Sequence, residues 1–188
     1  MAKSSKRENI LRATLKLIVQ HDLENTSMDM IAKEAEVGMG TIYNYFSSKE
    51  ILINELYCES KREMVRTVFE GHSVTLPLRE QFIRIWHNVF YYSLEHPAVF
   101  QFLEQYSYSP IISDEAKELS WQLWLPSFEL IEKAREQQIL KDLPTEALLL
   151  ISTSPIYSLV REAISGRINL DKSQIEAAII ACWDAIKR

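Results

Sequence analysis

The chain has 188 residues and a formal net charge of −5, from 21 Lys and Arg against 26 Asp and Glu. This length suits one ordinary domain, or a small module joined to a larger core, and excludes a multidomain enzyme. The acidic balance excludes a protein that coats nucleic acid by bulk charge. Only four glycines occur, which leaves little material for glycine-rich phosphate loops or turn-dense β architectures.

The helical period of apolar residues is present almost everywhere, and no run alternates as a strand would. We therefore predict an all-α fold. The first part of the chain is expected to form helices over residues 6–21, 27–35, 39–45 and 49–70. Ser27 or Thr26 can cap the second of these helices, and the S-x-x-E pattern from Ser47 to Glu50 suits the start of the fourth.

A second helical unit follows. Helices are expected over residues 78–95, 97–107, 114–138, 144–164 and 171–187. Pro126 predicts a kink or a break near Leu125, because proline removes a helical hydrogen bond. The domains are predicted as residues 1–50, with a helix-turn-helix at about 27–46, and residues 51–188, joined by the long helix at about 49–70.

The segment from Thr26 to Leu52 carries the most specific pattern in the chain. Two short helices joined by the tight turn Glu36-Val37-Gly38 make a helix-turn-helix, whose second helix suits the major groove of DNA. The identities resemble the signature of the tetracycline-repressor (TetR) family of bacterial transcriptional regulators. The matching residues are Thr26, Ile31, Ala32, Ala35, Val37, Gly40, Thr41, Ile42, Tyr43, Tyr45, Phe46, Lys49, Glu50 and Leu52.

Two positions depart from the family pattern. Glu36 stands where the family favours Gly, and Gly38 stands where it favours Ser. A left-handed Glu costs on the order of 1 kcal/mol, and Gly at a helix cap costs only a few tenths relative to Ser. We expect the fold to tolerate both, while the missing hydroxyl at position 38 removes one potential DNA contact.

The resemblance implies which residues meet DNA. Base or phosphate contacts are expected from the helix at 39–45, and phosphate contacts from the N-termini of two neighbouring helices. The expected contact residues are Thr26, Ser27, Gly38, Met39, Gly40, Thr41, Tyr43, Asn44, Tyr45 and Lys49. For Tyr43 the alternative is packing, and for Asn44 it is simple exposure to solvent. Weak phosphate contact is also expected from five cations in the first 16 residues, where Glu8 is the only acid: Lys3, Lys6, Arg7, Arg12 and Lys16.

Aromatic residues concentrate between Phe82 and Phe128, where 12 of the 19 lie. The resemblance implies that helices in this region enclose an effector pocket, and an aromatic lining suits a flat, apolar ligand. Candidate pocket residues are Trp86, Phe90, Phe102, Tyr106, Trp121, Trp124, Phe128 and Tyr157. The alternative is that these side chains fill a packed core.

The last two predicted helices resemble a dimer surface. A twofold protein presents two recognition helices to half-sites about 34–36 Å apart, and helices from two subunits can form a four-helix interface. Candidate interface residues are Leu148, Ile151, Leu159, Ile175, Ile179, Cys182 and Ile186. The alternative is packing within one chain.

No catalytic or metal-binding pattern is found, and we expect no enzyme activity, no cofactor and no metal. With no signal peptide or membrane span, and with Cys58 and Cys182 far apart, a cytoplasmic protein is expected. The predicted function is a homodimeric repressor, released from a palindromic operator by a small apolar or aromatic effector. The alternative is a DNA-binding regulator of the same fold without such an effector, which acts through protein partners or in chromosome organisation.

Overall fold

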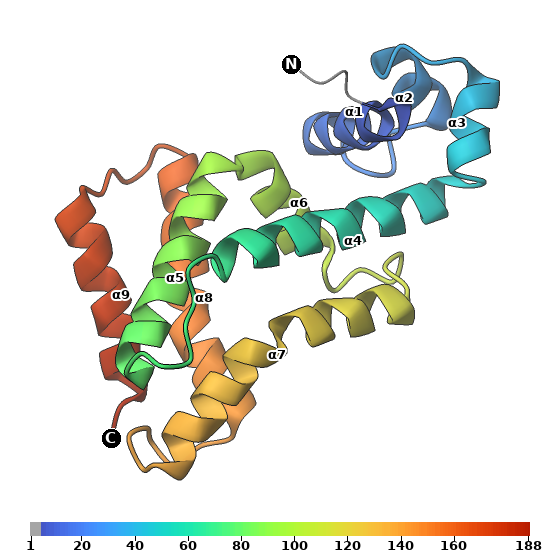
Figure 1. The fold of residues 1–188 in the computed structure, drawn as a ribbon. Coiled ribbons are helices and arrows are strands. Elements are labelled where there is room, and N and C mark those ends of the chain that lie inside the picture. The colour runs from blue at the N-terminus through green and yellow to red at the C-terminus, as the bar shows by residue number, and fades with distance from the viewer. Residues whose placement is uncertain (1–4) are drawn as a thin grey trace. The chain divides into compact units, whose positions relative to one another are not determined.

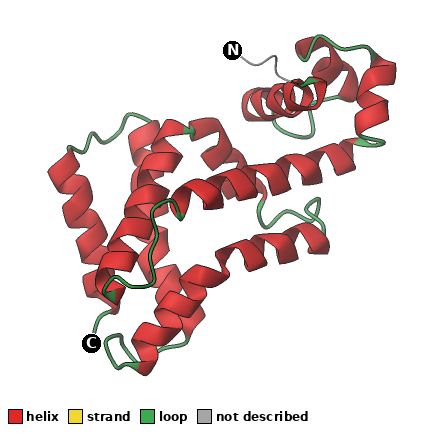
Figure 2. Cartoon of the chain, in the orientation of Figure 1, coloured by secondary structure: helices red, strands yellow, loops and turns green. Residues whose placement is uncertain are grey.

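The computed structural model describes residues 5–188, and this part of the chain forms nine α-helices and no strand (Figures 1 and 2). The all-α prediction is confirmed. Lys3, predicted as part of the basic run, lies outside the described residues. The folded chain divides into two compact units. The first comprises the chain up to Arg62 together with Ala98–Ser120, and the second comprises Glu63–Pro97 and Trp121–Arg188.

The first unit contains α1 (Lys6–His21), α2 (Met28–Glu34), α3 (Met39–Tyr45), most of α4 (Lys49–Val68) and α6 (Pro97–Tyr106). Its core holds apolar side chains from each of these helices, because the apolar positions of each recur at helical spacing. Fully buried examples are Ile10, Ile18, Ile31, Ile42, Phe46, Leu52, Ile53 and Phe102. Because α6 clusters with the first helices, this division differs from the sequence-based boundary at residue 50.

The second unit contains α5 (Leu78–Glu95), most of α7 (Asp114–Glu136), α8 (Thr145–Ile164) and α9 (Lys172–Ile186). Helices α5, α8 and α9 pack on one another, as Figure 1 shows. Phe82 and Trp86 stack with ring centroids 4.1 Å apart, and the Trp183 ring meets Phe82 at 5.0 Å. These rings form the centre of this three-helix core.

Helix ends follow local chemistry. Asp171 and Gln174 form a capping box at the start of α9, and Ser27 accepts a hydrogen bond from the Met30 N–H at the start of α2. One expectation is corrected: Ser48, not Ser47, accepts a hydrogen bond from the first turn of α4. Of the kink or break expected near Leu125, the break does not occur, since α7 continues through Pro126.

Candidate nucleic-acid interface

The turn between α2 and α3 is built on a residue with positive φ. Glu36 has φ = 55°, its N–H donates to the Lys33 carbonyl, and the Val37 N–H donates to the Ala32 carbonyl. This pair of hydrogen bonds is the Schellman arrangement that ends a helix, and it places Glu36 where glycine is usual. The left-handed conformation expected for Glu36 is confirmed, and α3 begins three residues later.

Helix α3 is fastened by one face and presents the other to solvent. Ile42 is fully buried, and Phe46, the residue after the helix, is 1% exposed. Tyr43 and Tyr45 remain 49% and 47% exposed, so they do not pack as core residues. Met39, Gly40 and Asn44 are also exposed, and Thr41 is half-buried. A short helix that offers hydroxyl, amide and thioether groups on one open face suits contact with base edges and phosphates.

The two residues expected to bind phosphate at the start of α2 differ in accessibility. Ser27 is exposed and its Oγ accepts the Met30 N–H at 3.2 Å. Thr26 is 1% exposed, and its hydroxyl donates to the Asp22 carbonyl at 2.8 Å. The assignment of Thr26 to DNA contact is therefore corrected, because this side chain is enclosed in the first unit and braces the chain between α1 and α2.

Lys49 is held from within the protein. Its ammonium donates to the Leu23 carbonyl at 2.5 Å. Partial burial lowers the pKa of Lys49, and the nearby Glu24 carboxylate opposes this effect. Lys49 therefore supports the α1–α2 connection, a role that its position in the sequence did not indicate. Its contact with phosphate remains a prediction.

Two cations of α1, Arg7 and Lys16, are paired with acids of the same unit. Arg7 Nη2 lies 2.6 Å from Glu55 and 3.5 Å from Glu59, and its guanidinium lies 5.9 Å from the centre of the Phe46 ring. Lys16 pairs with Glu34 at 2.5 Å. These ion pairs, which join residues far apart in the chain, reduce the local positive charge that the first 16 residues carry by composition.

The predicted effector residues do not come together in one site. Trp86 and Phe90 are buried in the α5–α8–α9 core, and the Trp86 Nε1–H donates to the Ser152 carbonyl at 2.9 Å. Phe102 and Tyr106 belong to the first unit, and the Tyr106 hydroxyl accepts the Leu23 N–H. Trp124 meets Phe69 at 6.0 Å in the second unit, and Tyr157 is half-buried on α8. The expectation that Trp86, Phe90, Phe102 and Tyr106 line a pocket is corrected, since these side chains pack against protein.

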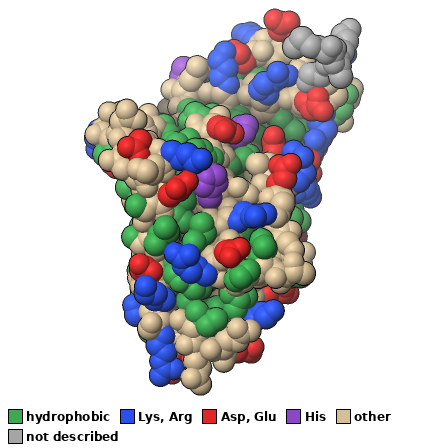
Figure 3. Space-filling view, turned by 60° about the vertical axis from the view of Figure 1, so that its left-hand side comes forward, with side chains coloured by type: hydrophobic (Ala, Val, Ile, Leu, Met, Phe, Trp, Pro, Cys, Tyr) green, Lys and Arg blue, Asp and Glu red, His purple; other side chains and the backbone are tan. Residues whose placement is uncertain are grey.

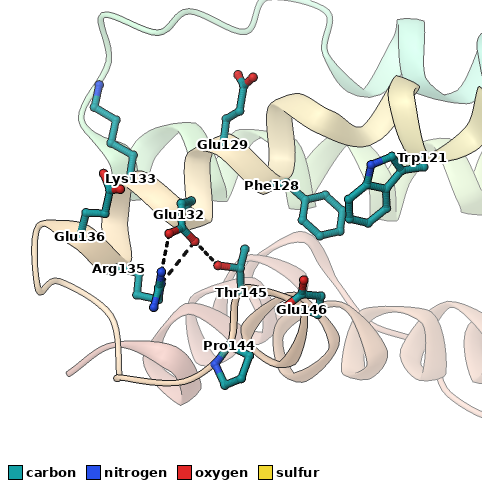
Figure 4. Close-up of a pocket in the computed structure, with 10 residues that line it drawn as sticks. All are labelled: Trp121, Phe128, Glu129, Glu132, Lys133, Arg135, Glu136, Pro144, Thr145 and Glu146. Carbon is teal, nitrogen blue, oxygen red and sulfur yellow. Dashed lines mark hydrogen bonds and ion pairs between the residues drawn. The ribbon is translucent and has the colours of Figure 1, made fainter.

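Two of the predicted residues, Trp121 and Phe128, line a groove of about 830 Å³ between α7 and the start of α8 (Figure 4). Their ring centroids are 4.0 Å apart. Four glutamates, Lys133 and Arg135 complete most of the lining. Glu132 accepts hydrogen bonds from Arg135 and Thr145, which lower the pKa of its carboxyl. The groove therefore combines an aromatic end with a charged and largely acidic end.

The residues predicted for a dimer surface are mostly interior. Five of them are at most 4% exposed within one chain, because they face the other helices of the α5–α8–α9 core: Leu148, Ile175, Ile179, Cys182 and Ile186. Their assignment to an interface is corrected. Ile151 remains 41% exposed and Leu159 is half-buried. The apolar side chains that these helices do expose include Leu150 at 61% and Ile180 at 36%, and neither was among the predicted interface residues.

Comparison with known proteins gives consistent matches along the chain. Residues 10–56 match the family model described as bacterial regulatory proteins, tetR family, and residues 77–187 match the tetracyclin repressor-like, C-terminal domain. An uncharacterised HTH-type transcriptional regulator of Haemophilus influenzae is 29% identical over all of this chain and 98% of its own. A TetR family transcription regulator of Marinobacter aquaeolei VT8 superposes with a TM-score of 0.90 at 26% identity, covering 97% of this chain and 95% of that one. A TetR-family regulator of Haemophilus influenzae Rd gives 0.79 at 27% identity, with 97% of both chains covered.

Proposed function

The chain belongs to the tetracycline-repressor family of bacterial transcriptional regulators, and from this we propose that it is a homodimeric repressor of a palindromic operator. The observation that carries the proposal is the open face of α3, where Tyr43, Tyr45 and Asn44 are exposed while Ile42 and Phe46 fasten the helix. Phosphate contacts from the tyrosines position such a helix, and neighbouring groups read base edges. We assign the chain regulation rather than catalysis, and a cytoplasmic location on the chromosome.

A second copy would cover the apolar surface left on α8 and α9. Helix α8 is long and apolar enough to cross a membrane by length and composition, yet only 22% of its most apolar window is buried. The main exposed apolar groups are Leu150 and Ile151 on α8 and Ile180 on α9. A dimer contact explains the exposed apolar side chains of α8 and α9 better than a membrane span does, because α8 also packs against α5 and α9.

We further propose that a small ligand of the second unit releases the protein from DNA. Within residues 5–188, the hydroxyls of Tyr92 and Ser127 are buried in this unit without a hydrogen-bond partner. Other buried serines donate to their own helix, as Ser93 does to the Val89 carbonyl. Buried polar atoms of this kind call for a partner outside the chain. A ligand with a polar group as well as an apolar body would supply one.

The alternative, a regulator that needs no small ligand, is favoured by a different observation. Trp86, Phe90 and Phe102 pack tightly against protein, so much of the aromatic content is already explained by the cores of the two units. Ordered water would then satisfy the two hydroxyls. The Tyr92→Phe and Ser127→Ala variants distinguish a regulator that binds a small ligand from one that does not. Loss of the ligand response in both variants, with folding retained, supports the regulator that binds a ligand.

Gel retardation on DNA upstream of the protein's own gene tests DNA binding. Tyr43→Ala is the test variant, and Tyr108→Ala is the matched control, since Tyr108 is a 90% exposed tyrosine outside the helix-turn-helix. Loss of one phosphate contact per subunit should weaken binding by roughly tenfold or more in a dimer. Absence of a retarded band for the unmodified protein at low salt, with every upstream fragment, would reject the proposed function.

A further inference from the structure

The connection between α1 and α2 is held by both backbone groups of one residue. The Leu23 N–H donates to the Tyr106 hydroxyl at 3.1 Å in a buried contact, and the Leu23 carbonyl accepts from Lys49 at 2.5 Å. Tyr106 is the last residue of α6, and Lys49 is the first of α4. Beside them, Gln105 Nε2 donates to the Asp22 carboxylate at 3.4 Å. Side chains of α6 and α4, two helices from distant parts of the chain, therefore both hydrogen-bond to the backbone of Leu23 within the first unit.

The local backbone explains why the Leu23 N–H needs the Tyr106 hydroxyl as its acceptor. Asp22 ends α1 with φ = 63°, so the chain leaves the helix and the Leu23 N–H has no helical acceptor. A buried N–H without an acceptor costs stability, and here the phenol oxygen of Tyr106 fills that role. Tyr106 is 8% exposed and its ring lies 5.5 Å from that of Phe102, which fixes the position of the hydroxyl.

Only three residues separate Leu23 from Ser27, the cap of α2. Thr26 in between is buried and tied back to the Asp22 carbonyl, so this segment has little freedom to absorb a displacement. Helix α2 in turn packs against α3. A shift at Leu23 is therefore passed to the helix that faces DNA.

We infer that Tyr106 is a positioning residue for DNA binding, through which α6 sets the placement of α2 and α3. The inference rests on the proposed function and adds to it a route of control from α6 to the helix-turn-helix through Leu23. It also gives Tyr106 a role other than the ligand contact expected from the sequence, because its hydroxyl oxygen accepts the Leu23 N–H.

The test compares Tyr106→Phe with the control Tyr108→Phe, which removes the hydroxyl of a 90% exposed tyrosine. Binding to a short, fluorescently labelled, mixed-sequence duplex is measured by anisotropy over a range of KCl concentrations. Amide hydrogen exchange at Leu23 is measured on the same proteins without DNA. The dependence of affinity on salt reports the number of phosphates engaged, and a mere loss of folded protein would leave that slope unchanged.

We expect Tyr106→Phe to exchange the Leu23 amide about tenfold faster or more. Its affinity for the duplex should fall by about fivefold or more, with the logarithmic salt slope shallower by about one. Tyr108→Phe should match the unmodified protein in both assays. An unchanged salt slope together with an unchanged affinity would overturn the inference, as would a Leu23 amide that exchanges at its original rate.

A second variant covers a folding failure. Gln105 is exposed, so Gln105→Leu removes the contact with Asp22 without opening the core. If Tyr106→Phe does not fold, a salt slope of Gln105→Leu equal to that of the unmodified protein overturns the inference, and a shallower slope supports it. If the unmodified protein binds no duplex at low salt, the proposed function fails, while Leu23 exchange still decides whether Tyr106 holds the connection.

Discussion

Glu36 adopts a conformation that its side chain disfavours. With φ = 55° it occupies the same position in its Schellman turn as Gln138 after α7 and Gly166 after α8, which have φ = 59° and 73°. A side chain with a Cβ is strained there, whereas glycine is not. We predict that Glu36→Gly raises the free energy of unfolding by about 0.5–1 kcal/mol, measured by urea denaturation.

The neighbouring residue provides the matched control. Ala35 has φ = −79° and a buried side chain, so Ala35→Gly relieves no strain. It removes a buried methyl group and makes the unfolded chain more flexible. That variant should be less stable than the unmodified protein. Glu36→Gly being as destabilising as Ala35→Gly would show that the Glu36 side chain contributes contacts that outweigh its strain.

Lys61 on α4 carries a charge that its surroundings disfavour. Its ammonium lies 5.4 Å from the centre of the Tyr57 ring, and burial lowers the pKa of Lys61 to about 8 from 10.5. Because the folded pKa lies below the unfolded one, the unfolded state binds more protons between about pH 8 and 10.5. The contribution of Lys61 to the free energy of unfolding therefore rises with pH across that window. Below about pH 8 the full cost of burying its charge is present.

We predict that Lys61→Met raises the free energy of unfolding at pH 7 by on the order of 1–3 kcal/mol. The gain should shrink as the pH rises from about 8 to 10.5, as measured by chemical denaturation at a series of pH values. Lys172→Met, at an exposed lysine, controls for the change in net charge. A gain that is equal at pH 7 and pH 10.5 would contradict the proposed cost of the buried charge.

At the scale of the element, the N-cap residue of α3, Gly38, has no conformational need to be a glycine. Gly38 has φ = −72°, makes no side-chain cap, and leaves open space where a Cβ would stand. Serine there can accept an N–H of the first turn. We predict that Gly38→Ser raises the thermal unfolding midpoint, by an amount equivalent to about 0.3–1 kcal/mol. Gly38→Ala cannot accept that hydrogen bond and should not raise the midpoint. An equal rise in both variants would show that the effect comes from restricting the unfolded backbone alone.

The helices could be predicted because each carries its own apolar period and end signals. The predicted range for α5, residues 78–95, agrees with the structure to the residue. Covered faces were harder to assign. The stripe of Ile175, Ile179 and Cys182 on α9 shows that this face is buried, but the same pattern fits a second chain or the chain's own helices. Trp86 posed the same problem. A buried tryptophan at this position is equally compatible with packing against Ser152 and with packing against a ligand.

The candidate site was predictable where the pattern is local and hidden where the contacts are long-range. Exposure of Tyr43 and Tyr45 follows from their places beside Ile42 and Phe46 on a short helix. The bond from Leu23 to Tyr106 joins residues 83 positions apart, and no spacing rule signals it. Burial of Thr26 was missed although its contact is local, since the hydroxyl that suits a helix cap donates instead to the carbonyl of Asp22, four residues earlier.

At the scale of the whole molecule, charge is dispersed rather than gathered. Figure 3 shows charged side chains of both signs scattered over one face, with apolar side chains between them. Two cations of α1 are paired with acids of α2 and α4: Lys16 with Glu34, and Arg7 with Glu55. DNA binding by such a protein depends on a few placed contacts more than on overall potential, and a twofold assembly would double each of them.

The last prediction therefore concerns assembly. Leu150 and Ile180 are 61% and 36% exposed on α8 and α9, and their burial against a second copy would supply part of the association free energy. Arginine at both positions would place charges in that contact. We predict that the Leu150→Arg/Ile180→Arg double variant sediments as a monomer with unchanged helical content. Its affinity for a palindromic operator should fall by at least about a hundredfold, because each subunit alone reaches one half-site.

The control for this variant is Tyr108→Arg, which adds charge at a 90% exposed apolar residue of the other unit and should leave the sedimentation coefficient unchanged. Sedimentation velocity and circular dichroism on the same samples separate loss of assembly from loss of fold. A double variant that remains dimeric and folded would place the twofold contact elsewhere. The exposed apolar surface of α8 would then need another occupant, and the large exposed fraction of Leu150 would have to be explained without a second copy of the chain.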